Sequence, residues 1–385
     1  MASSDDTANG PRLTQRQRRA DEPVTPDDPD RELPFLDLDA LEQQARGLLP
    51  PDVYDYYAGG SGAETTLTVA TGAWRAWRLR PRVLRGGAPV QLGTTLLGTD
   101  VATPVGVAPW AYQGMAHPDG ERATARGAAA AGALMTVSTS ATTRLEDVAT
   151  VTPVGPRWFQ LYWLHSAAHT DDLARRAGQA GYTALVLTVD LPLLGRRLRD
   201  LRHDFALPAG LLLANHPPVQ GIQPPLQAVA TRSWTFADIG RFAEISGLPV
   251  VVKGVLRGDD AARCVAAGAA AVWVSTHGGR QADPAVASAE ALPEIVEAVG
   301  DEAEVYADGG IRSGSDVLCA LALGARAVFL GRPTAWGLTT GGADGVARVI
   351  SGLTEDLAHT MTVCGLDDVR AVPRDTVVRA PWAGR

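Results

Sequence analysis

Short apolar runs alternate with longer alanine-rich amphipathic stretches along most of the chain. From residue 104 onward, eight of these runs have the length and composition of buried strands. They span 104–108, 133–138, 158–162, 184–189, 249–253, 271–275, 304–307 and 327–330. Helical stretches between them span 120–131, 171–180, 236–245, 259–266, 289–299 and 315–323. Continuous apolar strands joined by helices indicate a parallel sheet covered on both faces. Eight such units predict an α/β fold, the (β/α)8 TIM barrel.

The alternative to a barrel is an open, doubly wound sheet. That fold favours a Gly-x-Gly-x-x-Gly turn after the first strand, and residues 104–116 contain none. Upstream of the strands, 35–49 and 67–79 have helical patterns, so an N-terminal helical segment is expected. Residues 205–233, rich in Pro, Leu and Gln, fall between strands four and five and predict a long loop or lid.

Composition narrows the organisation of the 385 residues. Residues 1–32 are polar and contain several prolines, which predicts a disordered tail rather than a signal peptide. Residues 33–385 then form a single barrel domain. Hydrophobic residues make up 45% and charged residues 20% of the chain, as in globular proteins.

Charge and cysteine content argue against several classes of partner. The net charge is -8 and no basic block is present, which disfavours nucleic acid. No apolar run approaches the ~18 residues of a membrane span. The three cysteines, Cys264, Cys319 and Cys364, show neither metal nor disulfide spacing, so we expect no metal site and a cytoplasmic protein.

Candidate chemistry is concentrated in His277-Gly-Gly-Arg280, directly after the sixth strand. The imidazole of His277 titrates near neutrality, and the planar fork of Arg280 matches a carboxylate. The segment is equally compatible with a glycine-rich turn bearing two solvated side chains. Lys253 ends the fifth strand and is the only lysine among 35 basic Lys and Arg residues, which favours a functional role for it over chance survival.

The carboxyl ends of the other strands are also polar, and these ends form the active-site face of a barrel. The candidates there are Pro109, Trp110, Ala111, Ser138, Gln160, Tyr162, Thr188, Asp190, Arg197, Ser275, Asp308, Gly309, Gly310, Arg312, Gly331 and Arg332. The glycine- and arginine-containing turns after strands seven and eight predict a phosphate site. Ordinary turns with solvated arginines are the alternative.

The remaining candidates suggest a ring-shaped ligand and an acid substrate. Lys253, Gln160, Thr188 and Ser138 could surround a flat polar heterocycle, although Gln160 and Thr188 could equally be satisfied core residues. Asp190 could orient His277, or cap a turn. Arg197 and Arg280 could bind a carboxylate together, with Tyr56 and Tyr162 at a substrate hydroxyl.

Several motifs together resemble a known family. They are Tyr54-Asp-Tyr-Tyr57, His117-Pro-Asp-Gly-Glu121, Phe159-Gln-Leu-Tyr162, Thr188-Val-Asp190, Gly195-Arg-Arg197, Val252-Lys-Gly254, His277-Gly-Gly-Arg-Gln281 and Asp308-Gly-Gly-Ile-Arg312. From about Pro34 to Gly365 the chain resembles the FMN-dependent 2-hydroxy-acid oxidases and dehydrogenases. Within that family it is most similar to the hydroxymandelate-oxidase-like branch, through 158–164 and 195–200.

The resemblance implies FMN in the barrel mouth, His277 as base with Asp190 as its partner, and Arg197 and Arg280 as carboxylate binders. Tyr56 and Tyr162 bind the hydroxyl. It places Lys253 beside the flavin and gives flavin contacts to Ser138, Gln160 and Thr188. It implies a ribityl-phosphate site made by Asp308, Gly310, Arg312, Gly331 and Arg332. A homotetramer is the common assembly.

The chain departs from the family pattern at Thr276, Ala282, Trp110 and Ser140. Ser140 stands where glycolate oxidase has a tryptophan over the substrate, which favours a wider pocket and an aromatic 2-hydroxy acid. The expected reaction oxidises a 2-hydroxy acid to the 2-oxo acid, with molecular oxygen giving hydrogen peroxide. The alternatives are a decarboxylating monooxygenase, another phosphate-binding barrel enzyme, and a non-catalytic flavin-binding protein.

Overall fold

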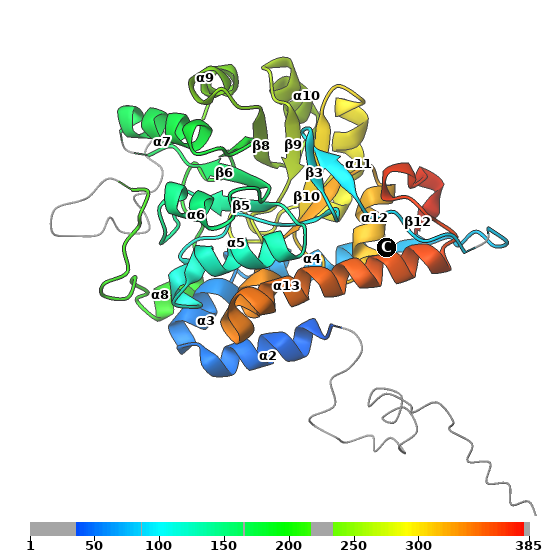
Figure 1. Cartoon of the computed structure of the whole chain (residues 1–385), viewed down its shortest axis with the longest axis horizontal. Helices are drawn as coiled ribbons and strands as arrows, with labels where there is room; N and C mark the ends of the chain where they lie inside the picture. The colour runs from blue at the N-terminus through cyan, green and yellow to red at the C-terminus, as the bar shows by residue number, and fades with distance from the viewer. Residues whose placement is uncertain (1–35, 86, 165, 217–233, 381–385) are drawn as a thin grey trace, which may run out of the picture. The chain divides into compact units, whose positions relative to one another are not determined.

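Eight parallel strands close into a barrel (Figure 1), which confirms the predicted fold class. The computed structural model describes residues 36–85, 87–164, 166–216 and 234–380. The barrel strands are β4 (Val105–Val107), β5 (Met135–Ser138), β6 (Arg157–Leu161), β7 (Leu185–Thr188), β8 (Val250–Val255), β9 (Ala271–Val274), β10 (Glu304–Asp308) and β11 (Ala327–Leu330). The last strand pairs with the first, with Val328 beside Val105, and closes the ring.

The two-residue period of the strands separates a packed barrel interior from a polar mouth. Side chains two apart on a strand point the same way, and several strands place an apolar residue before a polar one. Such pairs are Trp158 and Gln160, Val186 and Thr188, Val251 and Lys253, Trp273 and Ser275, and Tyr306 and Asp308. The apolar members meet across the lumen, since Trp158 of β6 lies 5.2 Å from Tyr306 of β10, ring centroid to ring centroid. The polar members therefore gather at the carboxyl ends.

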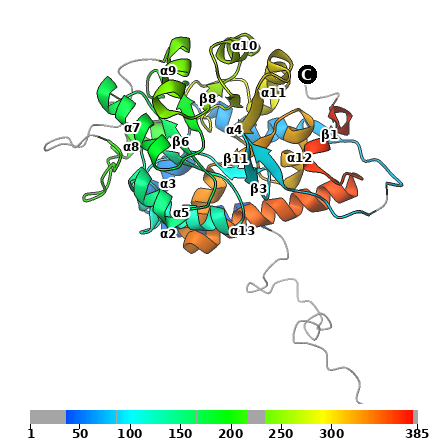
Figure 2. The ribbon, with the colours of Figure 1, turned by 45° about the horizontal axis from the view of Figure 1, so that its top comes forward.

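Helices surround the strands (Figure 2). They are α5 (Gly120–Ala130), α6 (Leu145–Val151), α7 (Ala167–Gln179), α9 (Phe236–Ser246), α10 (Gly258–Ala266), α11 (Ser288–Val299), α12 (Gly314–Ala322) and α13 (Arg332–Val363). A short helix, α8 (Leu198–Arg202), lies in the loop after β7, and single 3-10 turns span Gln113–Met115, Val369–Ala371 and Arg374–Thr376. The backbone of α13 is kinked at Gly341 and Gly342. Among the described residues, no helix has the length and apolar character needed to cross a membrane.

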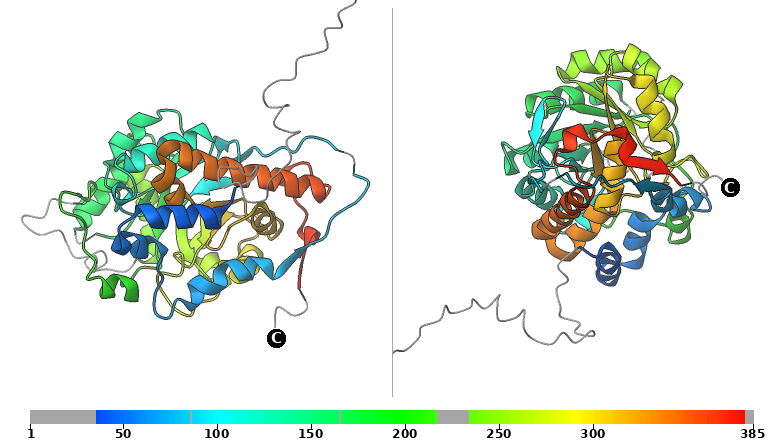
Figure 3. Two further views of the ribbon diagram at one scale, coloured as in Figure 1. Left: turned by 90° about the horizontal axis from the view of Figure 1, so that it is seen from below. Right: turned by 90° about the vertical axis from the view of Figure 1, so that its right-hand side faces the viewer.

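The N-terminal helical segment consists of α2 (Leu38–Leu48), α3 (Pro51–Ala58) and α4 (Thr65–Arg75). Helix α2 packs against α13, and the two run side by side in Figures 1 and 3. The predicted helix over 67–79 is wrong at its end. Residues Trp77–Leu79 form a strand, β1, that pairs antiparallel with β12 (Val377–Arg379). That partner lies about 300 residues away, so local periodicity could not reveal it. A small hairpin of β2 (Thr94–Leu96) and β3 (Thr99–Val101) follows.

The predicted loop over 205–233 is described only as far as residue 216 and contains no helix or strand there. This part is held against two helices, because the Asn215 side chain accepts from Leu145 N at the start of α6 at 2.9 Å, and Phe205 stacks on Tyr56 of α3 with a centroid distance of 4.7 Å. The rest of that loop, 217–233, and the predicted tail, 1–32, lie outside the described residues.

Helix α4 receives its N-terminal cap from a distant part of the chain. Its own N-cap residue, Glu64, is left-handed and makes no side-chain cap bond. Instead, Asp283 Oδ1 accepts from Thr66 N at 2.7 Å and from Thr66 Oγ1 at 2.8 Å, and Oδ2 accepts from Thr65 N at 3.3 Å. Asp283 follows the His277 loop, so the same contact fixes α4 against that loop.

We expect Asp283→Ala to lower the free energy of unfolding by about 1 kcal/mol, the usual cost of a lost helix cap. Denaturant unfolding of the purified protein would measure it. Asp283→Asn keeps one acceptor oxygen and should lose less. An unchanged midpoint for Asp283→Ala would show that α4 does not depend on this cap.

Candidate active site

A pocket opens at the carboxyl ends of the barrel strands, beneath α3 and α4. Seven of the eight strands contribute to its wall, through their last residues or the loops after them, and helices α3 and α4 of the N-terminal segment complete it. From the predicted set, the wall includes Tyr56, Pro109, Trp110, Tyr162, Thr188, Lys253, His277, Arg280, Asp308, Gly309, Gly310, Arg312, Gly331 and Arg332. The sequence prediction therefore placed most of its candidates in one cavity.

His277 and Asp190 form a largely buried pair at this pocket. His277 Nδ1 lies 2.9 Å from Asp190 Oδ1, and its Nε2 lies 3.4 Å from the Tyr162 hydroxyl. An ionised carboxylate can only accept, so Nδ1–H donates to Asp190 and Nε2 keeps its lone pair. Nε2 is thus the basic atom of the pair, beside the tyrosine hydroxyl.

The environment keeps this imidazole neutral in the absence of substrate. Burial lowers the pKa of His277 below its ordinary value, and the opposing effect of Asp190 does not fully restore it. Burial alone would raise the pKa of Asp190, but the hydrogen bond from His277 and the charge of Lys253 help to hold it below its ordinary value. The result is a neutral base next to an ionised carboxylate, which stabilises the imidazolium once a proton arrives.

Lys253 makes a buried ion pair at the centre of the barrel mouth. Its Nζ lies 3.0 Å from Asp308 Oδ2 and donates to Ser275 Oγ at 2.7 Å. Ser275 Oγ in turn donates to Asp308 Oδ1 at 2.7 Å. A buried charge needs such partners, and both Lys253 and Asp308 line the pocket. The ammonium is therefore fixed in place at the pocket floor.

Two partly buried arginines have backbone carbonyls as their hydrogen-bond partners within the described residues. Arg280 donates to the carbonyls of Tyr56 and Gly59, and Arg332 donates to those of Tyr57, Gly59 and Gly278. Burial lowers the pKa of Arg332 to about 9, and repulsion from Arg280 adds to the effect. Burial, with repulsion from Arg197, lowers that of Arg280 to about 10. Because carbonyls carry no net charge, this part of the pocket is prepared for an anion.

Arg197 and Arg332 differ in how many of their guanidinium N–H groups remain free to bind an anion. Arg197 is buried, and its Nε has no hydrogen-bond partner among the described residues. Arg332 was predicted to hold a phosphate, and it does line the pocket, but three of its N–H bonds already go to carbonyls. Arg312 lines the pocket nearby, with one Nη donating to its neighbour's carbonyl at 2.8 Å.

Unpaired buried polar atoms test whether FMN fits. Gln160 Nε2 and Thr188 Oγ1 are buried without a partner in the described part of the chain. Gln160 Oε1 is already occupied by Ser138 Oγ and Thr139 N, both at 3.2 Å, which fixes the orientation of the amide. A flat heterocycle with polar edges would satisfy the two free atoms and lie above Lys253.

The opposite end of the pocket fits a phosphate. Helix α13 starts after Gly331 with no side-chain cap, so the N–H groups of Arg332 and Thr334 have no acceptor within the helix, as at other anion-binding helix ends, whereas Pro333 carries no N–H. Gly309, Gly310 and Arg312 line the same end. No cluster of His, Cys, Asp or Glu that could hold a metal is found within the described ranges.

The other predicted residues lie behind the wall. Ser138, Gln160, Asp190 and Ser275 are bonded to each other or to lining residues, as described above. Ser140 is buried, with its Oγ 3.4 Å from His216 Nε2. Ala111 packs against the core. Sequence reasoning missed Tyr57, Leu67, Ala70 and Thr71, which line the pocket from α3 and α4; only Tyr57 had a signal, the Tyr-Asp-Tyr-Tyr motif.

Comparison with known proteins identifies the class. The FMN-dependent dehydrogenase family matches residues 45–379. An L-lactate oxidase of Nostoc sp. is 44% identical over 88% of this chain and 96% of its own length, and a 4-hydroxymandelate oxidase of Amycolatopsis orientalis is 43% identical over 88% and 97%. A crystal structure of mandelate oxidase with (S)-2-phenylpropionate superposes with a TM-score of 0.82, at 43% identity over 89% of this chain and 98% of that one.

The chain belongs to the FMN-dependent dehydrogenase family, and FMN is its cofactor. The resemblance read from the motifs is thereby confirmed. The unpaired atoms of Gln160 and Thr188, the fixed Lys253 and the open helix end agree with a bound flavin and its phosphate.

We expect Gly310→Ala to weaken FMN binding at least about tenfold. Gly310 has φ +81°, and an added Cβ would lie 2.3 Å from the carbonyl oxygen of Ala70 in α4. The left-handed conformation alone costs an alanine about 1–2 kcal/mol. Fluorescence titration of the apoprotein with FMN would measure the change.

The matched control is Gly72→Ala. Gly72 lies on α4, two residues after Ala70, and an added Cβ there meets nothing within 4 Å. It should bind FMN like the unaltered protein. Equal affinities for both variants would mean that the contact of Gly310 with α4 does not shape the phosphate end.

Proposed function

We propose that this protein oxidises a 2-hydroxy acid to the 2-oxo acid. The observation that supports it most directly is the neutral Nε2 of His277, backed by ionised Asp190 and placed beside the Tyr162 hydroxyl. The same pocket holds the partly buried guanidinium of Arg280, and Arg197 lies close enough to repel it. A base, a hydroxyl partner and two cations match the α-carbon, hydroxyl and carboxylate of one small molecule.

The chain's own residues bind, orient and deprotonate the substrate. Arg197 and Arg280 bind its carboxylate and hold the α-carbon near His277. His277 Nε2 accepts a proton from the substrate, and Asp190 stabilises the imidazolium that results. FMN, when bound, would accept the two electrons and the second proton that leave the substrate. Lys253, paired with Asp308, would supply a positive charge that stabilises negative charge on the flavin.

Molecular oxygen is the proposed electron acceptor, so that 2-hydroxy acid and oxygen give 2-oxo acid and hydrogen peroxide. The names of the relatives support it, because the lactate, hydroxymandelate and mandelate enzymes are all oxidases.

The proposed substrate has an aromatic side chain. The relative named 4-hydroxymandelate oxidase supports this, and so does an aromatic cluster next to the pocket. Tyr56, a wall residue, stacks on Phe205 and lies 5.5 Å from Tyr112, measured between ring centroids. Ser140, small and buried, replaces the tryptophan expected from glycolate oxidase.

We also propose a cytoplasmic homotetramer. The three cysteines are free and buried, which is compatible with a reducing compartment. The assembly follows from the family resemblance alone and can be checked by light scattering.

Anaerobic mixing with a panel of aliphatic and aromatic 2-hydroxy acids is the direct test. We expect the flavin absorbance to bleach with one class of acid, and air to restore it with release of peroxide. His277→Ala should retain FMN but lose at least about 10²-fold in the rate of flavin reduction. Carbon dioxide released on admitting air would assign the chain as a decarboxylating monooxygenase. An unchanged reduction rate in His277→Ala would reject His277 as the base.

We expect Asp190→Asn to change the pH profile in a specific direction. Asp190 raises the pKa of His277, so its removal should lower that pKa further and move the acid limb of kcat/KM to lower pH. The plateau should nevertheless fall about 10²-fold or more, because the imidazolium loses its partner. Stopped-flow flavin reduction across pH would measure both. An acid limb that moves to higher pH would contradict the assigned pairing.

A further inference from the structure

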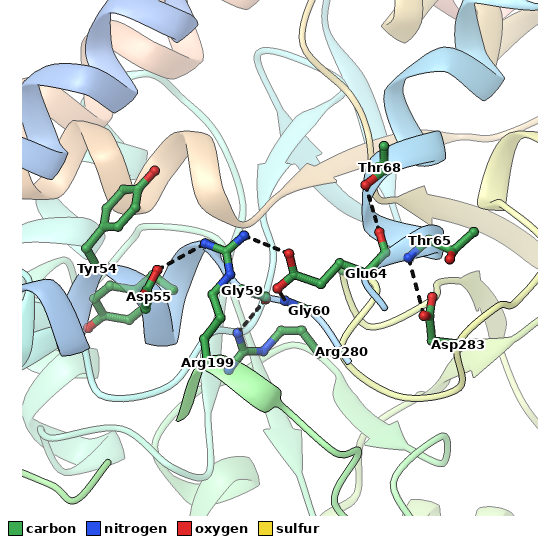
Figure 4. A network of polar contacts seen from close by, with 12 residues as sticks. Tyr54, Asp55, Gly59, Gly60, Glu64, Thr65, Thr68, Arg199, Arg280 and Asp283 are labelled. Atoms are coloured by element: carbon green, nitrogen blue, oxygen red, sulfur yellow. Dashed lines mark hydrogen bonds and ion pairs between the residues drawn. The ribbon is translucent and has the colours of Figure 1, made fainter. Parts of the chain in front are cut away.

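A double ion pair lies just outside the carboxylate end of the pocket, on side chains that take no part in the proposed reaction. Arg199 of α8 donates through Nη1 to Asp55 of α3 at 3.0 Å and through Nη2 to Glu64 at 2.7 Å (Figure 4). His203, at the C-terminal end of α8, lies 2.8 Å from the other Asp55 oxygen. These contacts connect α8 to the start of α4 and to α3.

The elements connected by Arg199 are those that hold the two substrate-binding arginines. Arg197 is the N-cap residue of α8, two positions before Arg199. Arg280 donates to the Gly59 carbonyl at 3.0 Å, and Glu64 accepts from Gly60 N at 2.9 Å (Figure 4). Arg199 therefore connects α8, whose N-cap is Arg197, with the glycine loop, 59–64, whose Gly59 carbonyl accepts from Arg280.

Helix α8 buries none of its own side chains. It is five residues long, none of them buried, and its N-terminus has no side-chain cap. Its leucines Leu198 and Leu201 are exposed. Without apolar burial, a helix of this length has no stability of its own. Its position depends on Arg199 and His203, on a backbone bond from Gly62 N to the Arg196 carbonyl at 2.9 Å, and on Phe205, which stacks on Tyr56 and donates its N–H to the Asp200 carbonyl at 2.9 Å.

The two substrate-binding arginines also repel each other: burial is the main cause of the lowered pKa of Arg280, repulsion from Arg197 adds to it, and Asp200 of α8 opposes it. A mobile α8 would let Arg197 move away from Arg280, because its Nε has no partner among the described residues to hold it. The hydrogen bond to Glu64 raises the pKa of Arg199. Burial alone would raise the pKa values of Asp55 and Glu64, but His203 and Arg199 lower that of Asp55, and Arg199 lowers that of Glu64. All three groups are therefore ionised near neutral pH, and both ion pairs are present there.

We propose that Arg199 is a positioning residue that sets the spacing between Arg197 and Arg280, and so the affinity of the site for the substrate carboxylate. The inference rests on the proposed function in that these two arginines bind the carboxylate. The net energy of a half-exposed ion pair is small. Its role here is geometric, because one planar fork joins two separate elements.

Arg199→Leu in the FMN-loaded protein is the principal test, with benzoate as a non-reacting carboxylate probe and flavin absorbance as the readout. We expect the dissociation constant for benzoate, and KM for the acid that reduces the flavin, to rise about three- to tenfold. The limiting rate of flavin reduction should change less than about twofold, since carboxylate binding is common to ground and transition states. FMN affinity should not change.

Two further variants distinguish positioning from a general loss of structure. Arg202→Leu removes an exposed arginine from the same helix and should bind benzoate like the unaltered protein. Glu64→Gln keeps the shape of the side chain and removes its charge, so it should weaken benzoate binding in the same direction if Arg199→Leu fails to fold. Arg199→Lys should restore part of the affinity.

Equal benzoate affinities for the Arg199→Leu and Arg202→Leu proteins would overturn the inference, as would a loss of FMN or of thermal stability with no change in benzoate affinity. Failure of the proposed function has a different signature, in which no 2-hydroxy acid bleaches the flavin of the unaltered protein while benzoate binding remains measurable and still sensitive to Arg199. Absence of benzoate binding to the unaltered protein would overturn both.

Discussion

The arrangement of this protein depends on how it accommodates several buried or partly buried positive charges at one end of a barrel. Lys253 is neutralised by Asp308, at 3.0 Å, but among the described residues the hydrogen-bond acceptors of Arg280 and Arg332 are main-chain oxygens. Desolvation of a guanidinium is costly unless its N–H groups are bonded. The hydrogen bonds are provided here without cancelling the charge, so the pocket keeps a positive potential. A cofactor phosphate and a substrate carboxylate are the natural counterions, which makes the two arginines part of both binding and folding.

This explains why the barrel needs its N-terminal segment. The carbonyls that accept from Arg280 and Arg332 come from Tyr56, Tyr57 and Gly59, at the end of α3. The following helix, α4, is fixed at three points to loops of the barrel mouth. Asp283 caps it, the buried Trp74 donates to the Gly309 carbonyl at 2.7 Å, and Gly310 lies against Ala70. The N-terminal segment that covers the pocket therefore also supplies hydrogen-bond acceptors to Arg280 and Arg332.

Much of the fold could be predicted because each barrel strand is recognisable from its own short stretch of sequence. Each is a continuous apolar run, and a period of two then separates the packed interior from the polar carboxyl end. This local rule was enough to bring His277, Asp190, Lys253 and Gln160 to one mouth. It could not show that Arg332 directs three N–H bonds to carbonyls, or that Trp77 belongs to a strand paired with Arg379, because both depend on contacts between segments distant in sequence. For the same reason Leu67, Ala70 and Thr71 were missed, since nothing in an amphipathic helix says which loop it will cover.

The catalytic pair shows how a local motif can encode a distant contact. Gly254 follows Lys253 with φ +104°, and an added Cβ would lie 2.6 Å from the carboxyl carbon of Asp190. Any larger residue there would push Asp190 away from His277, whose Nδ1 it accepts from at 2.9 Å. The lysine and the glycine of the Val-Lys-Gly motif thus have different tasks: Lys253 places charge at the pocket floor, and Gly254 leaves the space in which the carboxylate of the base can sit. Gly254 makes no contact with the substrate, but the proposed proton transfer to His277 depends on the space that it leaves for Asp190.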